Sequence, residues 1–339
     1  MKRKAGYALV SAMDEAFVPG VELLMYSFLR FNPWFKGDWI VISDGLSQSA
    51  KNRLARLYPA RFMKISAKLR RKALGVIEKD PITRGRFAQF FNLELFSLQG
   101  YRRVVFLDSD MLCLGDLSPL FFKAPDFGVA CDDLSLDPWF PELRSPRANG
   151  LTPNRLRYGR ELKQSFNSGM LSISSRFLGS RILDSILADP YFDDPGSFRE
   201  SAGTTDQFVL NRRFGDLAKN VGSAYNWPLH LDPLLRHAFR ATAADIRLLH
   251  FAGMAKPWKL SATEIAKRRP WEERHYYSLW HQLRQEMTEG LGHAEALADH
   301  EERTAERAKN GGWRSKLVGK WRGRWRNFLR LTRSRTARS

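Results

Sequence analysis

Features typical of secreted and membrane-spanning proteins are scarce in this chain of 339 residues. It has two cysteines, Cys113 and Cys131, each inside an apolar run, which argues against a disulfide framework and indicates a reducing compartment. No stretch approaches the roughly 18 uninterrupted apolar residues of a transmembrane helix. The basic start at residues 1–4 is not followed by an apolar segment before Asp14, so a signal peptide is not indicated. The sequence therefore predicts a cytoplasmic globular protein.

Acidic residues are absent from residues 311–339, although this segment holds ten lysines and arginines. The whole chain has a formal net charge of +19, so +9 remains for the first 310 residues. Large apolar residues recur in the segment at three- and four-residue intervals: Trp313, Leu317, Trp321, Trp325, Phe328 and Leu329. A helix with an aromatic stripe and a basic face lies flat in a membrane interface and prefers anionic lipid.

We therefore expect residues 311–339 to associate with the inner face of the cell membrane. Packing of this helix against its own domain is the alternative. Nucleic-acid binding, the other interpretation of a basic, tryptophan-rich segment, is not expected, because no nucleic-acid-binding fold precedes it.

A continuous apolar run at residues 104–107 predicts a central parallel strand that is covered on both faces. Asp108 and Asp110 follow where the strand stops. Two residues apart in extended chain, their carboxylates point the same way and repel unless a cation lies between them. The alternative interpretation is an aspartate-rich turn without a metal.

Apolar periodicity predicts alternating strands and helices in the remainder of the first 260 residues. This order is typical of an α/β fold with a doubly wound, mostly parallel central sheet and flanking helices, whose ligands bind beyond the carboxyl ends of the strands. Asp14 and Asp44 also follow strands and should lie at that edge. Residues 68–72 (KLRRK) are expected to form a basic loop, either a solvated charge run or a phosphate-facing flap. Residues 134–165 are expected to form a long loop that is functional or mobile. The expected strands are 6–12, 39–42, 62–65, 104–107, 127–131, 166–174 and 248–253, and the expected helices 20–29, 47–57, 86–98, 176–189 and one from 204.

Four motifs in order give this chain a family resemblance: LDSD at 107–110, NSGM at 167–170, TDQ at 205–207 and HFAGMAKPW at 250–258. From about Ala8 to Trp258, the chain resembles glycosyltransferase family 8, a group of retaining, metal-dependent enzymes that use nucleotide sugars. The resemblance implies the GT-A fold, a Rossmann-like domain, here followed by a C-terminal helical tail. It also implies that a UDP-sugar is the donor substrate.

The resemblance implies a metal site and a phosphate site. Asp108, Asp110 and His250 match the protein ligands to one divalent cation. Two carboxylates and an imidazole suit Mn²⁺ better than Mg²⁺, which prefers oxygen ligands alone. Lys256 matches the lysine that contacts the diphosphate, and Gly253 lets the backbone come close.

The resemblance also implies a sugar pocket. Asp206 and Gln207 match the acid and amide near the reacting sugar, and they are the expected catalytic pair. Asp132, Asn167 and Ser168 are expected to line the same pocket. Such fixed donors and acceptors suit the hydroxyl groups of a hexose.

Several positions of the donor site depart from the family pattern. Ala12 and Ser109 are expected beside the nucleotide sugar, but Asp14 stands where members often have asparagine and Phe17 where they have tyrosine. Phe17 can still stack on the uracil ring, and Asp14 can accept from its N3–H. Asn92 replaces a lysine or arginine, a charge for which Arg86 is the expected substitute; a surface position for Arg86 is the alternative.

These observations predict three parts: a catalytic domain at residues 1–265, a helical connector at 266–310 and a membrane-associating tail at 311–339. The expected activity is transfer of a hexose from a UDP-sugar to a glycolipid, lipopolysaccharide or polysaccharide acceptor. A nucleotidyltransferase and a catalytically inactive, membrane-anchored nucleotide-sugar-binding protein are the alternatives.

Overall fold

The computed structural model describes residues 6–80, 83–131, 166–198, 205–239, 242–253, 255–268 and 271–310. The chain divides into two compact units, Met1–Arg284 and Gln285–Ser339. The expected sugar-pocket residue Asp132, the expected loop 134–165 and the expected tail 311–339 lie outside the described residues. The division into parts 1–265, 266–310 and 311–339 stays a prediction.

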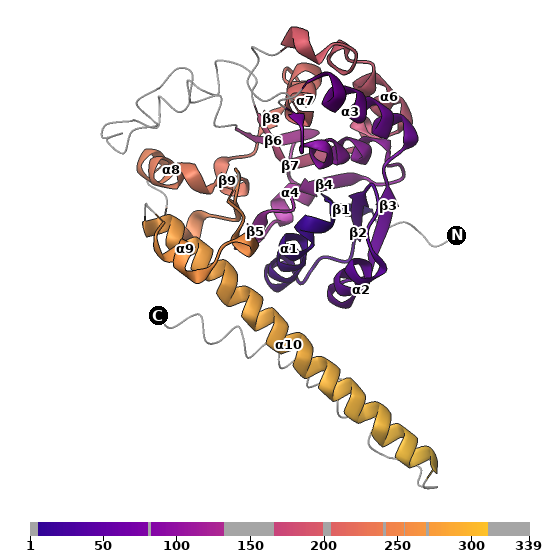
Figure 1. The fold of residues 1–339 in the computed structure, drawn as a ribbon, viewed down its shortest axis with the longest axis vertical. Helices are drawn as coiled ribbons and strands as arrows, with labels where there is room; N and C mark the ends of the chain where they lie inside the picture. The colour runs from indigo at the N-terminus through magenta and orange to yellow at the C-terminus, as the bar shows by residue number, and fades with distance from the viewer. Residues whose placement is uncertain are drawn as a thin grey trace. The chain divides into compact units, whose positions relative to one another are not determined.

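The main sheet of the first unit has seven strands in the order β3-β2-β1-β4-β7-β6-β8 (Figure 1). The four neighbours β3, β2, β1 and β4 pair in parallel, while β7 runs antiparallel to both β4 and β6. The expectation of a mostly parallel central sheet with flanking helices is confirmed. The strands are β1 Tyr7–Ala12, β2 Asp38–Ser43, β3 Ala60–Lys64, β4 Arg103–Leu107, β6 Phe127–Cys131, β7 Phe166–Ser174 and β8 Lys219–Asn220.

Strand β4 differs from the expectation in one respect. It is central and buried, but it is parallel only to β1, and its other neighbour β7 is antiparallel. An apolar run indicates that both faces of a strand are covered, and this burial does not depend on the direction of the neighbouring strand.

Helices cover both faces of the sheet, so alternate residues of β4 enter different cores (Figure 1). Val104 and Phe106 pack in the core that includes residues of α3, η3, α6 and α7. Val105 and Leu107 pack in the core formed with α1, α2 and α4. These helices are α1 Val18–Phe31, α2 Gln48–Leu57, α3 Ala67–Lys79, η3 Phe87–Ser97 (3₁₀), α4 Ser118–Phe122, α6 Ser180–Leu187 and α7 Asp206–Phe214.

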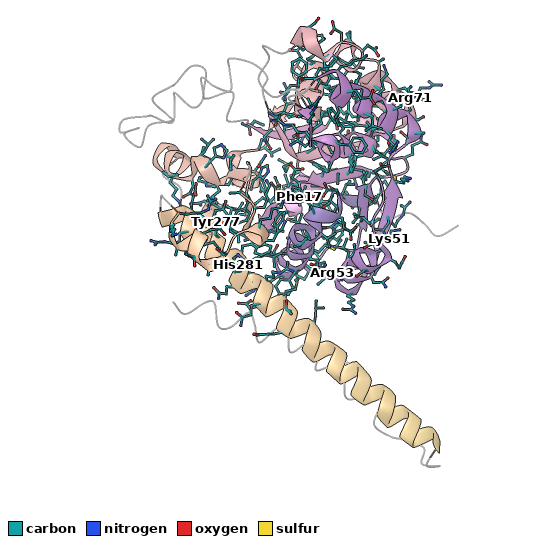
Figure 2. All side chains as sticks on the ribbon, viewed as in Figure 1. Phe17, Lys51, Arg53, Arg71, Tyr277 and His281 are labelled. Atoms are coloured by element: carbon teal, nitrogen blue, oxygen red, sulfur yellow. The ribbon has the colours of Figure 1, made fainter. Side chains whose placement is uncertain are left out.

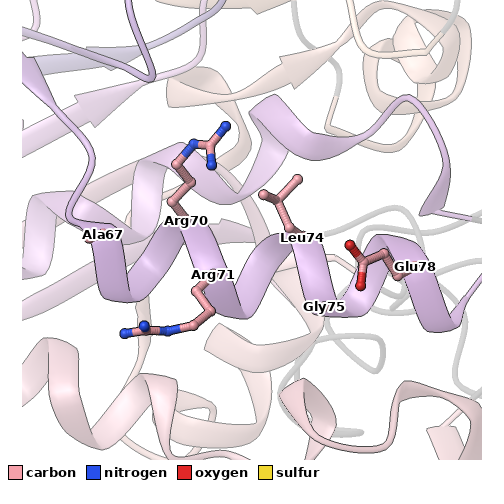
Figure 3. A pocket seen from close by; sticks show the side chains of 6 residues that line it. All are labelled: Ala67, Arg70, Arg71, Leu74, Gly75 and Glu78. Atoms are coloured by element: carbon pink, nitrogen blue, oxygen red, sulfur yellow. The ribbon is translucent and has the colours of Figure 1, made fainter.

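The basic stretch 68–72, expected to be a loop, lies in helix α3. Ser66 caps the helix, and Leu69, Ala73 and Val76 are buried at helical spacing, a period that the surrounding charges hid. Its cations form ion pairs with acids of other segments: Lys68 with Asp184, Arg70 with Asp44 and Lys72 with Asp193. One face of α3 lines a pocket in which none of the expected site residues takes part, bounded by Ala67, Arg70, Arg71, Leu74, Gly75 and Glu78 (Figure 3).

A second sheet of three strands, in the order β5-β10-β9, brings distant residues to the carboxyl edge of the main sheet. Strand β10 (Leu248–His250) pairs antiparallel with β5 (Met111–Cys113) and parallel with β9 (Trp227–Pro228). Because β5 follows Asp110 directly, the pairing of His250 with Met111 carries His250 to the two aspartates. The remaining elements are η1 Glu15–Phe17, η6 Ser175–Phe177, η7 Pro190–Phe192, η8 Pro195–Phe198, η9 Ser223–Tyr225, η10 Leu229–Leu231, α8 Asp232–Phe239, η11 Ala243–Asp245, η12 Pro257–Lys259 and α9 Ala262–Ala266.

Helix α10, Trp271–Asn310, continues from the first unit into the second, in which Gln285 bonds to Glu289 one turn later. A helix was expected across this connector. Among the described residues, none of the helices combines the length and apolarity needed to cross a bilayer.

Candidate active site

Asp108, Asp110 and His250 form a compact cluster of possible metal ligands. His250 Nε2 lies 3.2 Å from Asp110 Oδ1 and 3.8 Å from Asp108 Oδ2. One ligand atom from each residue lies within 4.8 Å of the others. Two carboxylates and one imidazole are a donor set that fits Mn²⁺, so the residues present suit the cation that the sequence predicts.

The backbone of Gly169 lies against this cluster. Its carbonyl accepts from the N–H of Asp108 over 2.8 Å. A Cβ at this position would come within 2.8 Å of His250 Cε1 and 2.9 Å of Asp108 Oδ2. Real Cβ atoms do not approach other atoms so closely, so the site requires glycine here.

The two carboxylates have opposite electrostatic environments. Burial and the neighbouring Asp110 carboxylate raise the pKa of Asp108 to about 7. For Asp110, burial is outweighed by His250 and Lys256, which hold its pKa below the usual range. Burial disfavours the charged form of His250, but Asp110 prevails and raises the pKa of the imidazole. A cation at this site would take the place of the protons that these groups share.

Lys256 is buried and bonds directly to Asp110 Oδ2, and its amino group also donates to the carbonyl of Phe251 over 3.0 Å. The lysine therefore holds the carboxylate from the side opposite His250. Its expected contact with a diphosphate stays a prediction. Gly253 has φ +94°, a conformation that favours glycine, just before this turn.

A chain of side-chain amides leads from His250 to the expected catalytic pair. His250 Nδ1 lies 2.9 Å from Asn226 Oδ1, and Asn226 Nδ2 donates to Asn167 Oδ1 over 2.8 Å. Asn167 Nδ2 in turn donates to Gln207 Oε1 over 3.2 Å, as does the backbone N–H of Ser168. Asn226 was not singled out from the sequence. Its place follows from the pairing of β9 with β10, and periodicity gives no sign of that pairing.

Asp206 opens helix α7 and is buried beside this chain of amides. It accepts a hydrogen bond of 2.6 Å from Asn92 Nδ2. Burial raises the pKa of Asp206, and hydrogen bonds from Ser168 and Asn92 oppose the shift. Asn92, expected only as a missing positive charge, is thus a direct partner of Asp206, one of the two predicted catalytic residues.

Phe17, the residue expected to stack on the nucleotide base, lies at the end of η1 (Figure 2). The Phe17 ring meets Trp258 edge-on at 5.4 Å, and the amino groups of Lys256 and Lys259 lie 5.8 and 5.9 Å from its centre. Asp14 accepts from the N–H of Ala16 as the cap of η1.

Ala12 and Ser109 also meet at this edge, because the Ser109 hydroxyl donates to the Ala12 carbonyl over 2.5 Å. Arg86 is the N-cap residue of η3, is half-buried and has no ion-pair partner in the described part of the chain. The hydrogen bond between Asn92 and Asp206 does not involve the guanidinium group of Arg86. The expected nucleotide and sugar contacts of these residues stay predictions.

Comparison with known proteins bears on the fold and the family. The chain is similar to lipopolysaccharide glucosyltransferase WaaO of Escherichia coli (strain K12), with 28% identity over 46% of this chain and 44% of WaaO. It is 21% identical to glycogenin of Neurospora crassa over 77% of this chain and 32% of glycogenin. The chain thus spans less than half the length of both relatives.

Two solved structures share the fold. The galactosyltransferase LgtC, determined with donor and acceptor sugar analogs, has a TM-score of 0.59 at 17% identity, covering 82% of this chain and 95% of LgtC. The glycosyltransferase GlyE of Streptococcus pneumoniae TIGR4 has a TM-score of 0.50 at 21% identity, covering 83% and 63%. The fold is therefore GT-A, as expected. The model of "Glycosyl transferase family 8" matches residues 8–262, and the chain belongs to this family of glycosyltransferases.

Proposed function

We propose that this glycosyltransferase moves a hexose from a UDP-sugar to a glycolipid, lipopolysaccharide or polysaccharide acceptor, with retention and with a divalent metal. One observation carries the proposal: the Asp108, Asp110 and His250 cluster is joined by hydrogen bonds through Asn226 and Asn167 to Gln207, next to the buried Asp206. A metal site and a set of hydroxyl-binding groups in one network are what transfer from a nucleotide sugar requires.

Asp108, Asp110 and His250 would hold the cation, which when bound neutralises charge on the departing diphosphate. Lys256 holds Asp110 ionised on its other side and supplies a further positive charge nearby. Mn²⁺ is the proposed metal, since the imidazole ligand suits it better than Mg²⁺.

Asp206 and Gln207 are the proposed contacts of the transferred sugar, with Asn167 and Ser168 at the same pocket. Asp206 is held by neutral donors, and its remaining acceptor capacity suits a sugar hydroxyl. Phe17 is the proposed stacking platform for the uracil base.

The first experiment is a panel of UDP-sugars, with UDP release measured with and without Mn²⁺. We expect release that depends on Mn²⁺ and falls by about 100-fold or more in Asp108→Ala and His250→Ala, because each removes a ligand of the cation. Asp184→Ala is the matched control, since Asp184 is exposed and paired with Lys68 on the surface. Full turnover in the two ligand variants would refute the metal assignment.

Two further outcomes separate this proposal from the alternatives. Release of pyrophosphate from UTP and a hexose 1-phosphate, with no UDP released from the UDP-sugars, would identify a nucleotidyltransferase. Stabilisation by UDP-sugars without any turnover would identify a nucleotide-sugar-binding protein.

The proposed acceptor and location rest on the composition of residues 311–339 and on the similarity to the lipopolysaccharide glucosyltransferase WaaO. We place the protein in the cytoplasm, peripheral on the inner face of the cell membrane. Flotation with anionic and neutral liposomes tests this proposal on the full chain and on a chain ending at Asn310. Loss of anionic-liposome binding in the shorter chain is expected, and undiminished binding would overturn the proposal.

A further inference from the structure

His250 faces the candidate metal cluster with one ring nitrogen and Asn226 with the other. Nε2 lies 3.2 Å from Asp110 Oδ1, and Nδ1 lies 2.9 Å from Asn226 Oδ1. Both residues are almost fully buried, with Asn226 1% and His250 3% exposed, so water does not compete for these positions. Whether Nδ1 carries a proton therefore depends on which atom of the Asn226 amide faces it.

Backbone donors determine the orientation of the amides. The N–H of Gly169, which can only donate, points 2.9 Å to the Asn167 atom that also faces Asn226, so this Asn167 atom must be the oxygen. Asn226 consequently presents its NH₂ group to Asn167 over 2.8 Å. Its carbonyl oxygen is left to face His250, and an oxygen there can only accept, from Nδ1–H.

The orientation of the Gln207 amide, at the other end of this series of hydrogen bonds, follows in the same way. The backbone N–H of Ser168 donates to Gln207 Oε1 over 3.2 Å, which identifies that Gln207 atom as an oxygen. Asn167 Nδ2 donates to the same oxygen over 3.2 Å, in agreement with the orientation derived from Gly169. Two successive peptide groups thus set the direction of every amide between His250 and Gln207.

We infer that Asn226 is a positioning residue that keeps the proton of His250 on Nδ1, so that Nε2 is the nitrogen available to a cation at Asp108 and Asp110. Through Asn167 it also couples the imidazole to Gln207. This inference rests on the proposed metal-dependent transfer and assigns a role to a residue outside the predicted site. An outer acceptor for the second nitrogen of a ligating histidine orients the ring and raises its basicity.

Two substitutions distinguish the effects of the two hydrogen bonds that Asn226 forms, one with His250 and one with Asn167. Asn226→Ala removes both the acceptor for His250 and the donor to Asn167. Asn226→Asp keeps an acceptor for Nδ1–H, with an added negative charge, and removes the donor to Asn167. Asn32→Ala is the control, because Asn32 is also a buried asparagine, which accepts from the Leu117 N–H over 2.7 Å and lies outside the network.

Binding of Mn²⁺ alone, measured by electron paramagnetic resonance, tests whether the hydrogen bond of Asn226 to His250 supports the metal site. We expect about 10- to 100-fold weaker binding in Asn226→Ala. Asn226→Asp should bind within a few-fold of the wild type or more tightly, and Asn32→Ala should be unchanged. In UDP release, Asn226→Asp should nevertheless be slower than the wild type, since the connection to Gln207 is lost. Binding in Asn226→Ala within twofold of the wild type, or equal weakening in the Asp and Ala variants, would overturn the inference.

The proton on Nδ1 is observed directly by nuclear magnetic resonance of metal-free protein labelled with ¹⁵N-histidine, and His250→Gln assigns its signal. We expect an Nδ1–H that exchanges slowly with water in the wild type and in Asn226→Asp, because it is hydrogen-bonded to residue 226, and faster exchange in Asn226→Ala. An Nδ1 without a proton in the wild type, or equal exchange rates in the wild type and Asn226→Ala, would overturn the inference. Because this readout needs no metal and no turnover, it decides the role of Asn226 even if the wild type neither binds Mn²⁺ nor hydrolyses UDP-sugars, a result that would refute the proposed function alone.

Discussion

Asn92 donates a hydrogen bond of 2.6 Å to Asp206 across 114 positions of sequence, and both side chains are only 4% exposed. The carboxylate is therefore held by a neutral amide where family members are expected to place a cation. Asn92 Oδ1, buried on the same side chain, has no hydrogen-bond partner within the described part of the chain. Both features indicate that the chain retains unfavourable polar burial beside the proposed sugar pocket, as functional sites often do.

Replacement of Asp206 by asparagine should stabilise the protein and reduce its activity. Burial raises the pKa of Asp206, so ionised Asp206 disfavours the folded state at neutral pH. Asp206→Asn keeps the side-chain shape and removes the charge. We expect an increase in the free energy of unfolding on the order of 1 kcal/mol at pH 7, measured by urea denaturation, with UDP release lowered at least about tenfold.

The effect of this substitution depends on pH in a defined direction. A carboxyl group whose pKa is higher in the folded state favours folding fully at pH values below its unfolded pKa of about 3.9, and this contribution is lost as the pH rises through the folded pKa. The stability difference between Asp206→Asn and the wild type should therefore shrink as the pH approaches 4. A difference that grows on acidification would contradict the assigned shift. Asp184→Asn is the exposed control.

Gly169→Ala should weaken the metal site although it replaces none of the proposed ligands. The added Cβ would lie 2.8 Å from Asn167 Oδ1 and from His250 Cε1, so these side chains must move. We expect a loss of about 1–3 kcal/mol in stability and at least about tenfold weaker Mn²⁺ binding. Gly75→Ala is the matched control in helix α3, where nothing lies within 4 Å of a new Cβ, and it should stabilise by about 0.5–1 kcal/mol. Equal Mn²⁺ affinity in both variants would contradict the geometry.

Tyr101→Phe should flatten the loss of stability at alkaline pH. Burial, with the hydrogen bond to Asp38, raises the pKa of Tyr101 to about 12. Because the folded pKa lies above the unfolded value of about 10, its contribution is present below pH 10 and is lost between about pH 10 and 12. Denaturation at a series of pH values should give a shallower decline for the variant across this window. Parallel curves for the two proteins would show that Tyr101 does not contribute.

The Cys113 thiol should resist alkylation in the folded protein. It is fully buried, and burial raises its pKa to about 12, whereas the thiolate is the reactive form. Peptide mass spectrometry after iodoacetamide treatment should find Cys113 modified in urea and unmodified under native conditions. Modification of Cys113 in native protein faster than global unfolding would contradict this expectation.

The sequence predicted much of the main sheet because apolar strands and the acids that follow them are local patterns. Asp108 and Asp110 follow β4, and Asp14 and Asp44 follow β1 and β2, as expected from the parallel pairing of these strands. The stretch 68–72 was wrong as a loop, because its charges concealed the apolar residues of α3. Helix 86–98 was right in place, although it has 3₁₀ geometry, a difference in hydrogen bonding that side-chain periodicity does not specify.

By itself, the sequence determined the family, the order of most strands of the main sheet, and the residue types of the candidate metal cluster, since these depend on short-range patterns and on four motifs. The tertiary structure alone decided that β7 runs antiparallel to β4, that Lys256 holds Asp110, and that Asn92 bonds to Asp206. It also decided that Asn226 faces His250. Such contacts join residues far apart in the chain, and they exist only once the two sheets and the buried amides have been brought together in one packed arrangement.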